Sequence, residues 1–221
     1  MIRPSLLRLY ELVRKRELED IWLVRLLWSR YEASALRRWE RMGRPLPPPA
    51  AYKRRLVAQY AQRFETKVLI ETGTFFGDML AANEGVFEKL ISIELDDTLH
   101  RRAQRRFAQR PHITLLNGDS GLLLEPILES ISEPCLLWLD AHYSGGVTAR
   151  GATDTPIVAE LQCILRNSIQ SHVVLIDDAR AFNGTNGYPT VRDIGEIAKG
   201  IRSNLSCEVA EDIIRLTPAE S

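Results

Sequence analysis

The sequence has few cysteines, and they are not arranged in pairs. Its 221 residues include three, at Cys135, Cys163 and Cys207, with no C-x-x-C spacing. An odd and scattered set argues against a disulfide framework and against a cysteine-based zinc site. We therefore expect a protein of a reducing compartment, with the cytoplasm as its location.

Long apolar runs are missing as well. The apolar stretch near the N-terminus is interrupted early by the charged segment "RKRELED" at 14–20. No later run reaches the roughly 18 apolar residues that crossing a bilayer requires. The sequence therefore predicts neither a secreted protein nor a transmembrane segment.

The chain has no net charge, because 29 basic residues balance 29 acidic ones. The balance is uneven, however, since residues 1–64 hold fifteen Lys and Arg but only six Asp and Glu. Such an asymmetry indicates that the N-terminal segment docks on something acidic. The acidic remainder of the same chain is the favoured partner, ahead of a nucleic acid or a membrane surface.

The N-terminal segment reads as a long amphipathic helix. Apolar residues recur at spacings of three and four from Leu6 to about Met42, and arginines occupy much of the other face. We expect the rings of Trp22, Trp28 and Trp39 to pack on the main domain. A helix lying on a membrane surface, and a homo-oligomer formed through this helix, are the alternatives.

A proline-rich stretch separates this helix from the rest of the chain. Gly43 and "PLPPP" at 45–49 end the helix, because proline cannot continue it. We expect an N-terminal helical extension and linker over 1–50, followed by a catalytic domain over 51–221. That domain opens with a further helix at 51–64.

From residue 66 onward, short apolar strands alternate with helical segments. The predicted strands lie at 67–71, 90–95, 113–119, 135–142 and 172–178. Strands that are apolar throughout are typical of a parallel sheet covered by helices on both faces. The end, "CEVAEDIIRLTP", predicts a hairpin that turns at Glu211 and Asp212. The fold class is therefore α/β, doubly wound around a mostly parallel sheet.

Each of the five predicted parallel strands ends near a carboxylate. The set comprises Glu71, Glu94, Asp119 (followed by Ser120), Asp140 (followed two residues later by His142) and the pair Asp177 and Asp178. A single acid there is ordinary turn or cap chemistry, but five strands repeating it is harder to explain in that way. Ligands of such sheets bind beyond the carboxyl ends of the strands. The pattern predicts a binding site at this edge.

The first strand leads into "VLIETGTFFGD" at 68–78, a loop with two glycines. Gly73 and Gly77 allow a tight turn and a close approach to a ligand. Glu94 follows at the end of the second strand, where an acid accepts hydrogen bonds from ribose hydroxyls. The pattern indicates an adenosine-containing ligand, with a plain turn and a helix cap as the alternative. Glu71 at the mouth would repel a pyrophosphate and attract a cationic tail, which favours S-adenosylmethionine over NAD.

These segments resemble a known family. "ETGTFFGD" is similar to the E/D-x-G-x-G-x-G motif of class I S-adenosylmethionine-dependent methyltransferases, "SIELDD" to their acidic second-strand motif and "NGDS" to their adenine-contacting segment. The resemblance covers about 66–217 and implies a seven-stranded sheet whose last strand is antiparallel. The cofactor residues that it implies are Glu71, Thr72, Gly73, Thr74, Gly77, Glu94, Asp119, Ser120 and Asp140. The sequence departs from the motif at Phe75, whose backbone we expect to replace the middle glycine with its ring turned away from the ligand.

A narrower resemblance links "LWLDAHYSGG" and "VVLIDDAR" to macrocin-type, metal-dependent sugar O-methyltransferases. It implies that Asp140, Asp177 and Asp178 bind magnesium. The general-base aspartate of that group falls on His142 here, which is a departure. His142 could be the base, because imidazole titrates near neutral pH, or it could only hydrogen-bond a loop carbonyl. The loop at 144–155 would form a wall or lid over the acceptor.

The sequence therefore predicts an S-adenosylmethionine-dependent methyltransferase, O-directed on a small molecule or sugar, and the narrower resemblance implies assistance by magnesium. A nicotinamide-dependent oxidoreductase and a non-enzymatic protein on the same fold are the alternatives. A nucleic-acid acceptor is disfavoured, because "DAHY" stands where base methyltransferases carry an N/D-P-P-Y-type motif.

Overall fold

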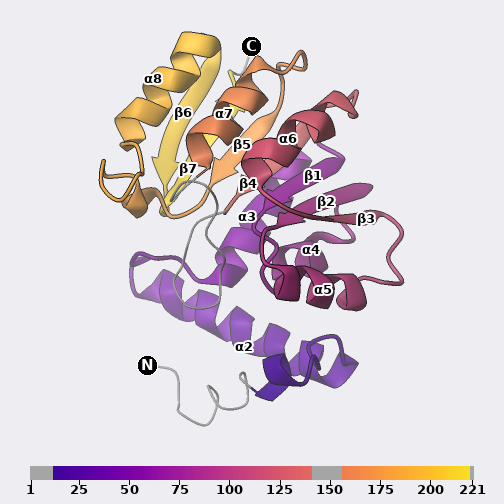
Figure 1. Cartoon of the computed structure of the whole chain (residues 1–221). Coiled ribbons are helices and arrows are strands. Elements are labelled where there is room, and N and C mark those ends of the chain that lie inside the picture. The colour runs from indigo at the N-terminus through magenta and orange to yellow at the C-terminus, as the bar shows by residue number, and fades with distance from the viewer. Residues whose placement is uncertain (1–11, 141–155, 220–221) are drawn as a thin grey trace.

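The computed structural model describes residues 12–140 and 156–219. Its centre is a seven-stranded sheet in the order β3-β2-β1-β4-β5-β7-β6 (Figure 1). The strands are β1 (Val68–Thr72), β2 (Lys89–Glu94), β3 (Ile113–Asn117), β4 (Cys135–Leu139), β5 (Val173–Ile176), β6 (Leu205–Ala210) and β7 (Ile213–Pro218). The first five pair in parallel, and β7 is antiparallel to both of its neighbours. The predicted doubly wound, mostly parallel sheet with its terminal hairpin is confirmed.

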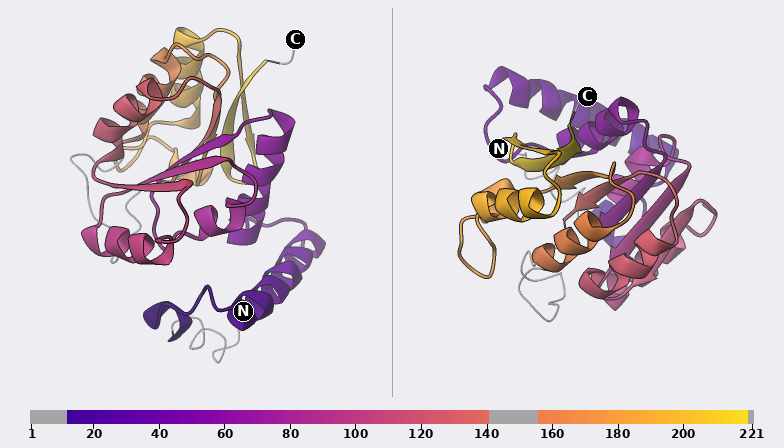
Figure 2. Two further views of the ribbon diagram at one scale, coloured as in Figure 1. Left: turned by 90° about the vertical axis from the view of Figure 1, so that its right-hand side faces the viewer. Right: turned by 90° about the horizontal axis from the view of Figure 1, so that it is seen from above.

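Helices cover both faces of the sheet (Figures 1 and 2). One face packs against α3 (Ala50–Arg63), α4 (Asp78–Asn83) and α5 (Asp97–Arg106), and the other against α6 (Ser120–Glu129), α7 (Ile157–Arg166) and α8 (Val191–Ile201). Successive strand residues point to opposite faces, so Leu69 and Ile70 belong to two separate hydrophobic clusters. All five residues of β1 are buried. This two-sided burial explains why the central strands are apolar throughout rather than alternating.

The predicted helix from Leu6 to about Met42 is wrong in one respect, because the chain breaks it. Residues 12–15 are helical, turns follow, and α2 (Trp22–Arg41) then begins a new helix. Glu17 has a φ of 53°, which a continuous helix does not allow. The break carries the acidic side chains of Glu19 and Asp20 to the arginines of α5, a tertiary contact that helical periodicity does not encode.

The N-terminal segment docks on its own chain, as the charge asymmetry predicted, but many of the ion pairs have the opposite sense. Its few acids bind the basic face of α5, in the pairs Glu17–Arg105, Glu19–Arg102 and Asp20–Arg106. Arg14 reaches back to Asp78 at the start of α4. The net positive charge of the segment therefore does not indicate which of its residues make the contact, because a few acids make much of it.

The three tryptophans of this segment differ in burial. Trp39 is buried, lies 4.8 Å from the ring of Tyr52 on α3 and donates a hydrogen bond to the carbonyl of Pro45 at 2.8 Å. Trp22 is 74% exposed, so the prediction that all three rings pack on the main domain fails for it.

Within the described residues, no helix is both long and apolar enough to cross a bilayer. The division of the chain at residue 50 stays a prediction.

Candidate functional site

The carboxyl ends of the parallel strands place the predicted acids along one edge of the sheet. Glu71 lies within β1, which is paired with β2 on one side and β4 on the other. Glu94 ends β2, and Asp140 follows β4 with its backbone N–H donating to the Thr72 carbonyl at 3.0 Å. The edge therefore has two halves, one at β1–β3 and one at β4–β5.

The loop after β1 is held in a left-handed turn. Gly73, Phe75 and Gly77 have φ values of 91°, 49° and 76°. The N–H of Gly73 donates to the Ile93 carbonyl at 2.9 Å, and that of Gly77 donates to the Thr74 carbonyl at 2.8 Å. Phe75 thus adopts a conformation that glycine takes without strain, as we expected of the residue at the motif's middle glycine.

The ring of Phe75 lies outside the hydrophobic core. It is 42% exposed, and its centroid is 4.0 Å from that of Phe76. Phe76 in turn lies close to two guanidinium groups, with Arg14 at 4.9 Å and Arg102 at 4.3 Å from its ring centre. The two rings therefore join the loop to the N-terminal segment, and the orientation of Phe75 relative to a ligand stays a prediction.

Glu94 fixes this loop through both of its carboxylate oxygens. Oε2 accepts from the backbone N–H of Phe75 at 2.7 Å, and Oε1 accepts from that of Asp96 at 2.9 Å. Burial raises the pKa of Glu94, and these N–H donors oppose the rise because they favour the carboxylate. Each oxygen still has a second lone pair, so the side chain can hold the loop and accept from a hydroxyl at once.

Glu71 is buried, at 2% exposure. The Ser92 hydroxyl donates to its Oε2 at 2.7 Å, and the Thr74 hydroxyl lies 2.6 Å from the Ser92 oxygen. Burial raises the pKa of Glu71 well above its ordinary value, and the charges of Asp140 and Glu94 raise it further, while Ser92 opposes the rise. A cation placed against this carboxyl would favour its ionised form.

Asp119 and Ser120 start α6. The Asp119 carboxylate accepts from the N–H of Gly121 at 2.8 Å, which is an N-cap contact. Its neighbour Asn117 donates to the Glu94 carbonyl at 2.8 Å, so the ends of β2 and β3 are tied together. Asp119 therefore caps helix α6, which was one of the alternatives at the sequence level.

Sequence reasoning missed Glu160 on α7. This carboxyl is 1% exposed, and burial raises its pKa to about 7, while the hydroxyls of Ser120 and Thr72 oppose the rise. A signal was present, because Glu160 falls on the apolar face of α7 beside Ile157, Leu161 and Ile164. An acid on a buried helix face is costly unless it has polar neighbours.

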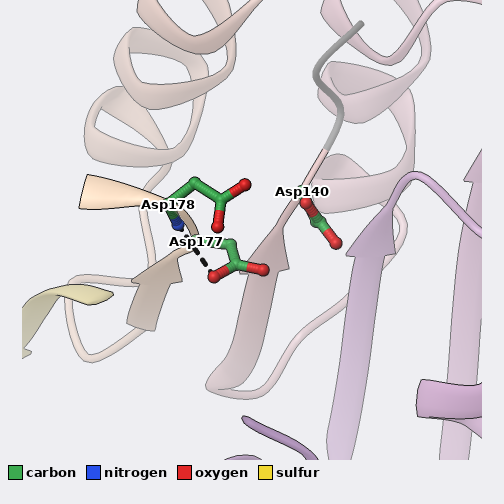
Figure 3. Close-up of side chains that lie close together, drawn as sticks. All are labelled: Asp140, Asp177 and Asp178. Carbon is green, nitrogen blue, oxygen red and sulfur yellow. Dashed lines mark hydrogen bonds between the residues drawn. The ribbon is translucent and has the colours of Figure 1, made fainter. Parts of the chain in front are cut away.

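The second half of the edge gathers three carboxylates. One oxygen each of Asp140, Asp177 and Asp178 lie within 4.8 Å of one another. Figure 3 shows them at the ends of the neighbouring strands β4 and β5. Asp177 is 5% exposed and its Oδ1 accepts from the N–H of Asp178 at 2.8 Å, while Asp178 has a φ of 54°. The left-handed backbone of Asp178 places its carboxylate beside those of Asp177 and Asp140. We call these three residues the acidic trio.

Lys53, which sequence reasoning also missed, reaches into the acidic trio from α3. Its Nζ lies 2.5 Å from Asp177 Oδ2 and 3.2 Å from Asp178 Oδ1. Burial lowers the pKa of Lys53, but the charges of Asp177, Asp178 and Asp140 more than offset this, so the pKa is raised. Burial and the Asp140 charge raise the pKa of Asp177, and the ammonium of Lys53 opposes them. The spacing of Lys53 from Leu56, Val57 and Tyr60, all buried, could have placed it on the inward face of α3.

The predicted base His142 and the predicted lid at 144–155 lie outside the described residues. The structure therefore brings together Glu71, Thr72, Gly73, Thr74, Gly77 and Glu94 in one half of the edge and the acidic trio in the other. Asp140 and Thr72 join the halves through the β1–β4 pairing.

Comparison with solved structures gives the class of fold. An O-methyltransferase from Bacillus cereus in complex with SAH matches with a TM-score of 0.58 and 14% identity, over 93% of this chain and 96% of that one. The O-methyltransferase TomG from Streptomyces achromogenes, involved in tomaymycin synthesis and in complex with SAM, matches with a TM-score of 0.57 and 18% identity, over 86% and 89% of the two chains. SAH-bound methyltransferase PaMTH1 of Podospora anserina matches with a TM-score of 0.53 and 14% identity, over 82% and 86%.

The chain thus has the Rossmann-like fold of class I S-adenosylmethionine-dependent methyltransferases, as its sequence motifs indicated. Among solved structures, the three similar proteins described above are methyltransferases, and two of them are O-methyltransferases. No protein-family model matches the sequence. No curated protein matches it either. The narrower resemblance to macrocin-type enzymes stays a prediction.

Proposed function

We propose that the protein is an S-adenosylmethionine-dependent methyltransferase that methylates a hydroxyl group of a small molecule such as a sugar. The observation that carries the proposal is the arrangement at the ends of β1 and β2. A left-handed glycine loop stands there beside two buried acids, Glu71 and Glu94, in a fold shared with proteins solved with SAM or SAH.

The cofactor residues take separate roles in this proposal. Glu94 accepts from the ribose hydroxyls, and the backbone of Thr72, Gly73, Thr74 and Gly77 forms the wall that the cofactor approaches. Asp119 and Ser120 border the adenine. Glu71 and Asp140 face the methionine end, where a cationic sulfonium and ammonium suit two buried carboxylates.

The acceptor would bind in the other half of the edge, near the acidic trio. Methyl transfer requires the acceptor oxygen to be in line with the methyl group, deprotonated and shielded from water. His142, two residues beyond Asp140, is the proposed base that takes the hydroxyl proton. Asp140 is the proposed second catalytic residue, since its carboxylate can orient the acceptor or that base.

Magnesium at Asp140, Asp177 and Asp178 is the remaining part of the sequence prediction. Carboxylate oxygens are ligands that magnesium prefers, and their convergence favours such a site. The ammonium of Lys53, however, already lies between two of the three carboxylates. The acidic trio therefore does not fit a divalent cation while Lys53 stays there, and the reaction proposed above uses no metal.

Calorimetric titration with S-adenosylmethionine, S-adenosylhomocysteine and NAD tests the cofactor. We expect S-adenosylhomocysteine to bind with an affinity in the micromolar range, about −8 kcal/mol, and NAD to give no heat of binding. Glu94→Ala should weaken binding by at least about tenfold, since it removes the ribose acceptor and releases the loop. Glu88→Ala is the matched control, because Glu88 is an exposed acid that pairs with Lys67 on the surface.

The two other candidates predict different titrations. An NAD-dependent oxidoreductase would bind NAD, and a non-enzymatic protein on this fold would bind none of the three ligands. Unchanged affinity in Glu94→Ala would show that the ribose lies elsewhere. A cytoplasmic location and an acceptor other than nucleic acid stay predictions from the sequence.

A further inference from the structure

The acceptor half of the edge contains a cation that belongs to the chain itself. Lys53 comes from α3, whose residues Leu56, Val57 and Tyr60 are buried in the core. The backbone that carries the lysine side chain is therefore part of a packed helix. Its ammonium contacts Asp177 Oδ2 at 2.5 Å and Asp178 Oδ1 at 3.2 Å. The side chain of Lys53 is 17% exposed and that of Asp177 is 3% exposed.

Two cationic side chains of the described chain already lie against the acidic trio. Lys53 faces Asp177 and Asp178 and senses the charge of Asp140. Arg180 contributes a second positive charge, with its guanidinium 3.0 Å from Asp178 Oδ1 and also paired with Asp212. Three carboxylates at this distance repel one another, and a neighbouring cation lowers the free-energy cost of keeping them ionised.

We propose that Lys53 is the resident cation of the acidic trio and occupies the position that a divalent metal would otherwise take. Magnesium binds oxygen at about 2.0–2.1 Å with a strict octahedral geometry, so it needs lone pairs that here point at the ammonium. An ammonium is a compact point charge with three donors, which suits two converging carboxylates and leaves its third donor for an acceptor oxygen. Lys53 is thus a positioning residue that opposes the rise in the pKa of Asp177 and holds its carboxylate in place.

This inference concerns the acceptor half of the proposed methyltransferase site. It rests on the proposed function only in so far as that half of the edge is assigned to the methyl acceptor. The test therefore uses metal binding, which needs neither cofactor nor activity. Failure of the cofactor titration would leave the cation test unaffected, and failure of the cation test would leave the cofactor assignment standing.

Binding of Mn2+, a spectroscopically visible substitute for magnesium, is measured by calorimetry and electron paramagnetic resonance on the full chain. We expect the wild-type protein to bind no Mn2+ at concentrations up to about 1 mM, near the weak limit of oxygen-ligand protein sites. Lys53→Met frees the carboxylates and should bind one Mn2+ at least about tenfold more tightly than the wild type. Lys53→Arg keeps a cation in the position and should exclude the metal as the wild type does.

Two further variants serve as controls for metal binding. Lys67→Met removes a surface lysine with a single acidic partner, Glu88, and should leave metal binding unchanged. Lys53→Met combined with Asp177→Asn removes both members of the closest pair, should fold even if Lys53→Met does not, and should lose the gained Mn2+. The proposal is overturned if the wild type binds Mn2+ as tightly as Lys53→Met, or if Lys53→Met folds and gains no binding.

Discussion

At the scale of single residues, the buried carboxyl of Glu160 makes stability depend on pH. Its pKa is raised from 4.5 to about 7, so the folded state holds the proton over a range in which the unfolded chain loses it. The stabilisation is present below pH 4.5 and is lost as the pH rises through 7. Over that interval the free energy of unfolding of the wild type should fall by up to about 3 kcal/mol relative to that of Glu160→Gln. Urea unfolding at several pH values measures this difference. An identical pH profile in the variant would contradict this.

The exposed Glu129 of the neighbouring helix α6 supplies the control for Glu160. Glu129→Gln changes the same chemical group at the surface and should leave the pH profile of unfolding as it is in the wild type. A change of equal size in both variants would mean that the profile reports overall charge.

Gly77 illustrates a second effect at this scale. It has a φ of 76°, and a Cβ atom added there would lie 2.6 Å from the Phe107 ring. Gly77→Ala should therefore lower the free energy of unfolding by about 1–3 kcal/mol and weaken S-adenosylhomocysteine binding, because the loop must shift. Gly85→Ala is the control, since nothing lies within 4 Å of its added Cβ and its φ is ordinary. A melting temperature equal to that of the wild type in Gly77→Ala would refute the argument.

Residue identities at the strand ends could be predicted because parallel strands bring their carboxyl ends to one edge. That rule located Glu71, Glu94 and Asp140 without any structure. It could not locate Lys53 or Glu160, because both reach the edge from helices, and the direction of a helical side chain depends on how the helix packs.

At the scale of elements, the turn between residues 15 and 22 ties the N-terminal segment to α5. Glu19 accepts from both Arg14 and Arg102, and the side chains of this trio are about one-tenth exposed. Glu19→Ala and Arg102→Ala should each destabilise the protein by about 2 kcal/mol, because each removes one member of a largely buried ion-pair network. The double variant should cost clearly less than the sum of the two, as measured by a double-mutant cycle in urea.

A nearby exposed pair shows what a weak coupling looks like. Arg105 and Glu17 bond the same two elements, but their side chains are 59% and 42% exposed. Their cycle should give a coupling clearly smaller than that between Glu19 and Arg102. Equal coupling in the two cycles would show that burial does not set the strength of this contact.

The periodicity of apolar residues could not predict the break in the N-terminal helix. Spacing of apolar residues correctly predicted helical structure on both sides of the break. The turn itself depends on pairs that join residues 86 to 88 positions apart, such as Asp20 with Arg106, and no local signal encodes these.

At the scale of the whole molecule, one helix presents apolar side chains that the described chain leaves uncovered. On and beside α2, Trp22 is 74% exposed and Leu27 is 56% exposed, with Ile21, Leu23 and Leu26 close to half exposed. Patches of this kind commonly mark an interface. The predicted homo-oligomer through the N-terminal helix would cover them, so Leu26→Glu with Leu27→Glu should lower the molar mass found by sedimentation.

A control for that variant lies on the opposite side of the sheet. Leu122 on α6 is 76% exposed, and Leu122→Glu adds one negative charge on a helix that covers the other face of the sheet from α3, against which α2 packs. Its molar mass should equal that of the wild type. A wild-type protein that sediments as a monomer at all concentrations would rule out this interface.

The overall architecture could be predicted because the alternation of buried strands with helices allows few topologies. Right-handed crossovers favour a doubly wound sheet, the resemblance to methyltransferases implied seven strands with an antiparallel last strand, and the terminal hairpin follows from its turn residues. The relation of the N-terminal extension to the sheet could not be predicted, since it depends on ion pairs between surfaces rather than on a pattern within either.

The position of Lys53 has a consequence for how the chain is made. Its partner Asp177 follows 124 residues later in the sequence. During translation the lysine therefore leaves the ribosome long before the carboxylates it neutralises, as does Arg14 before Asp78. The contact of Arg14 with Asp78 can form once β1 and the start of α4 have been synthesised, whereas the acidic trio and its contact with Lys53 can form only after β5.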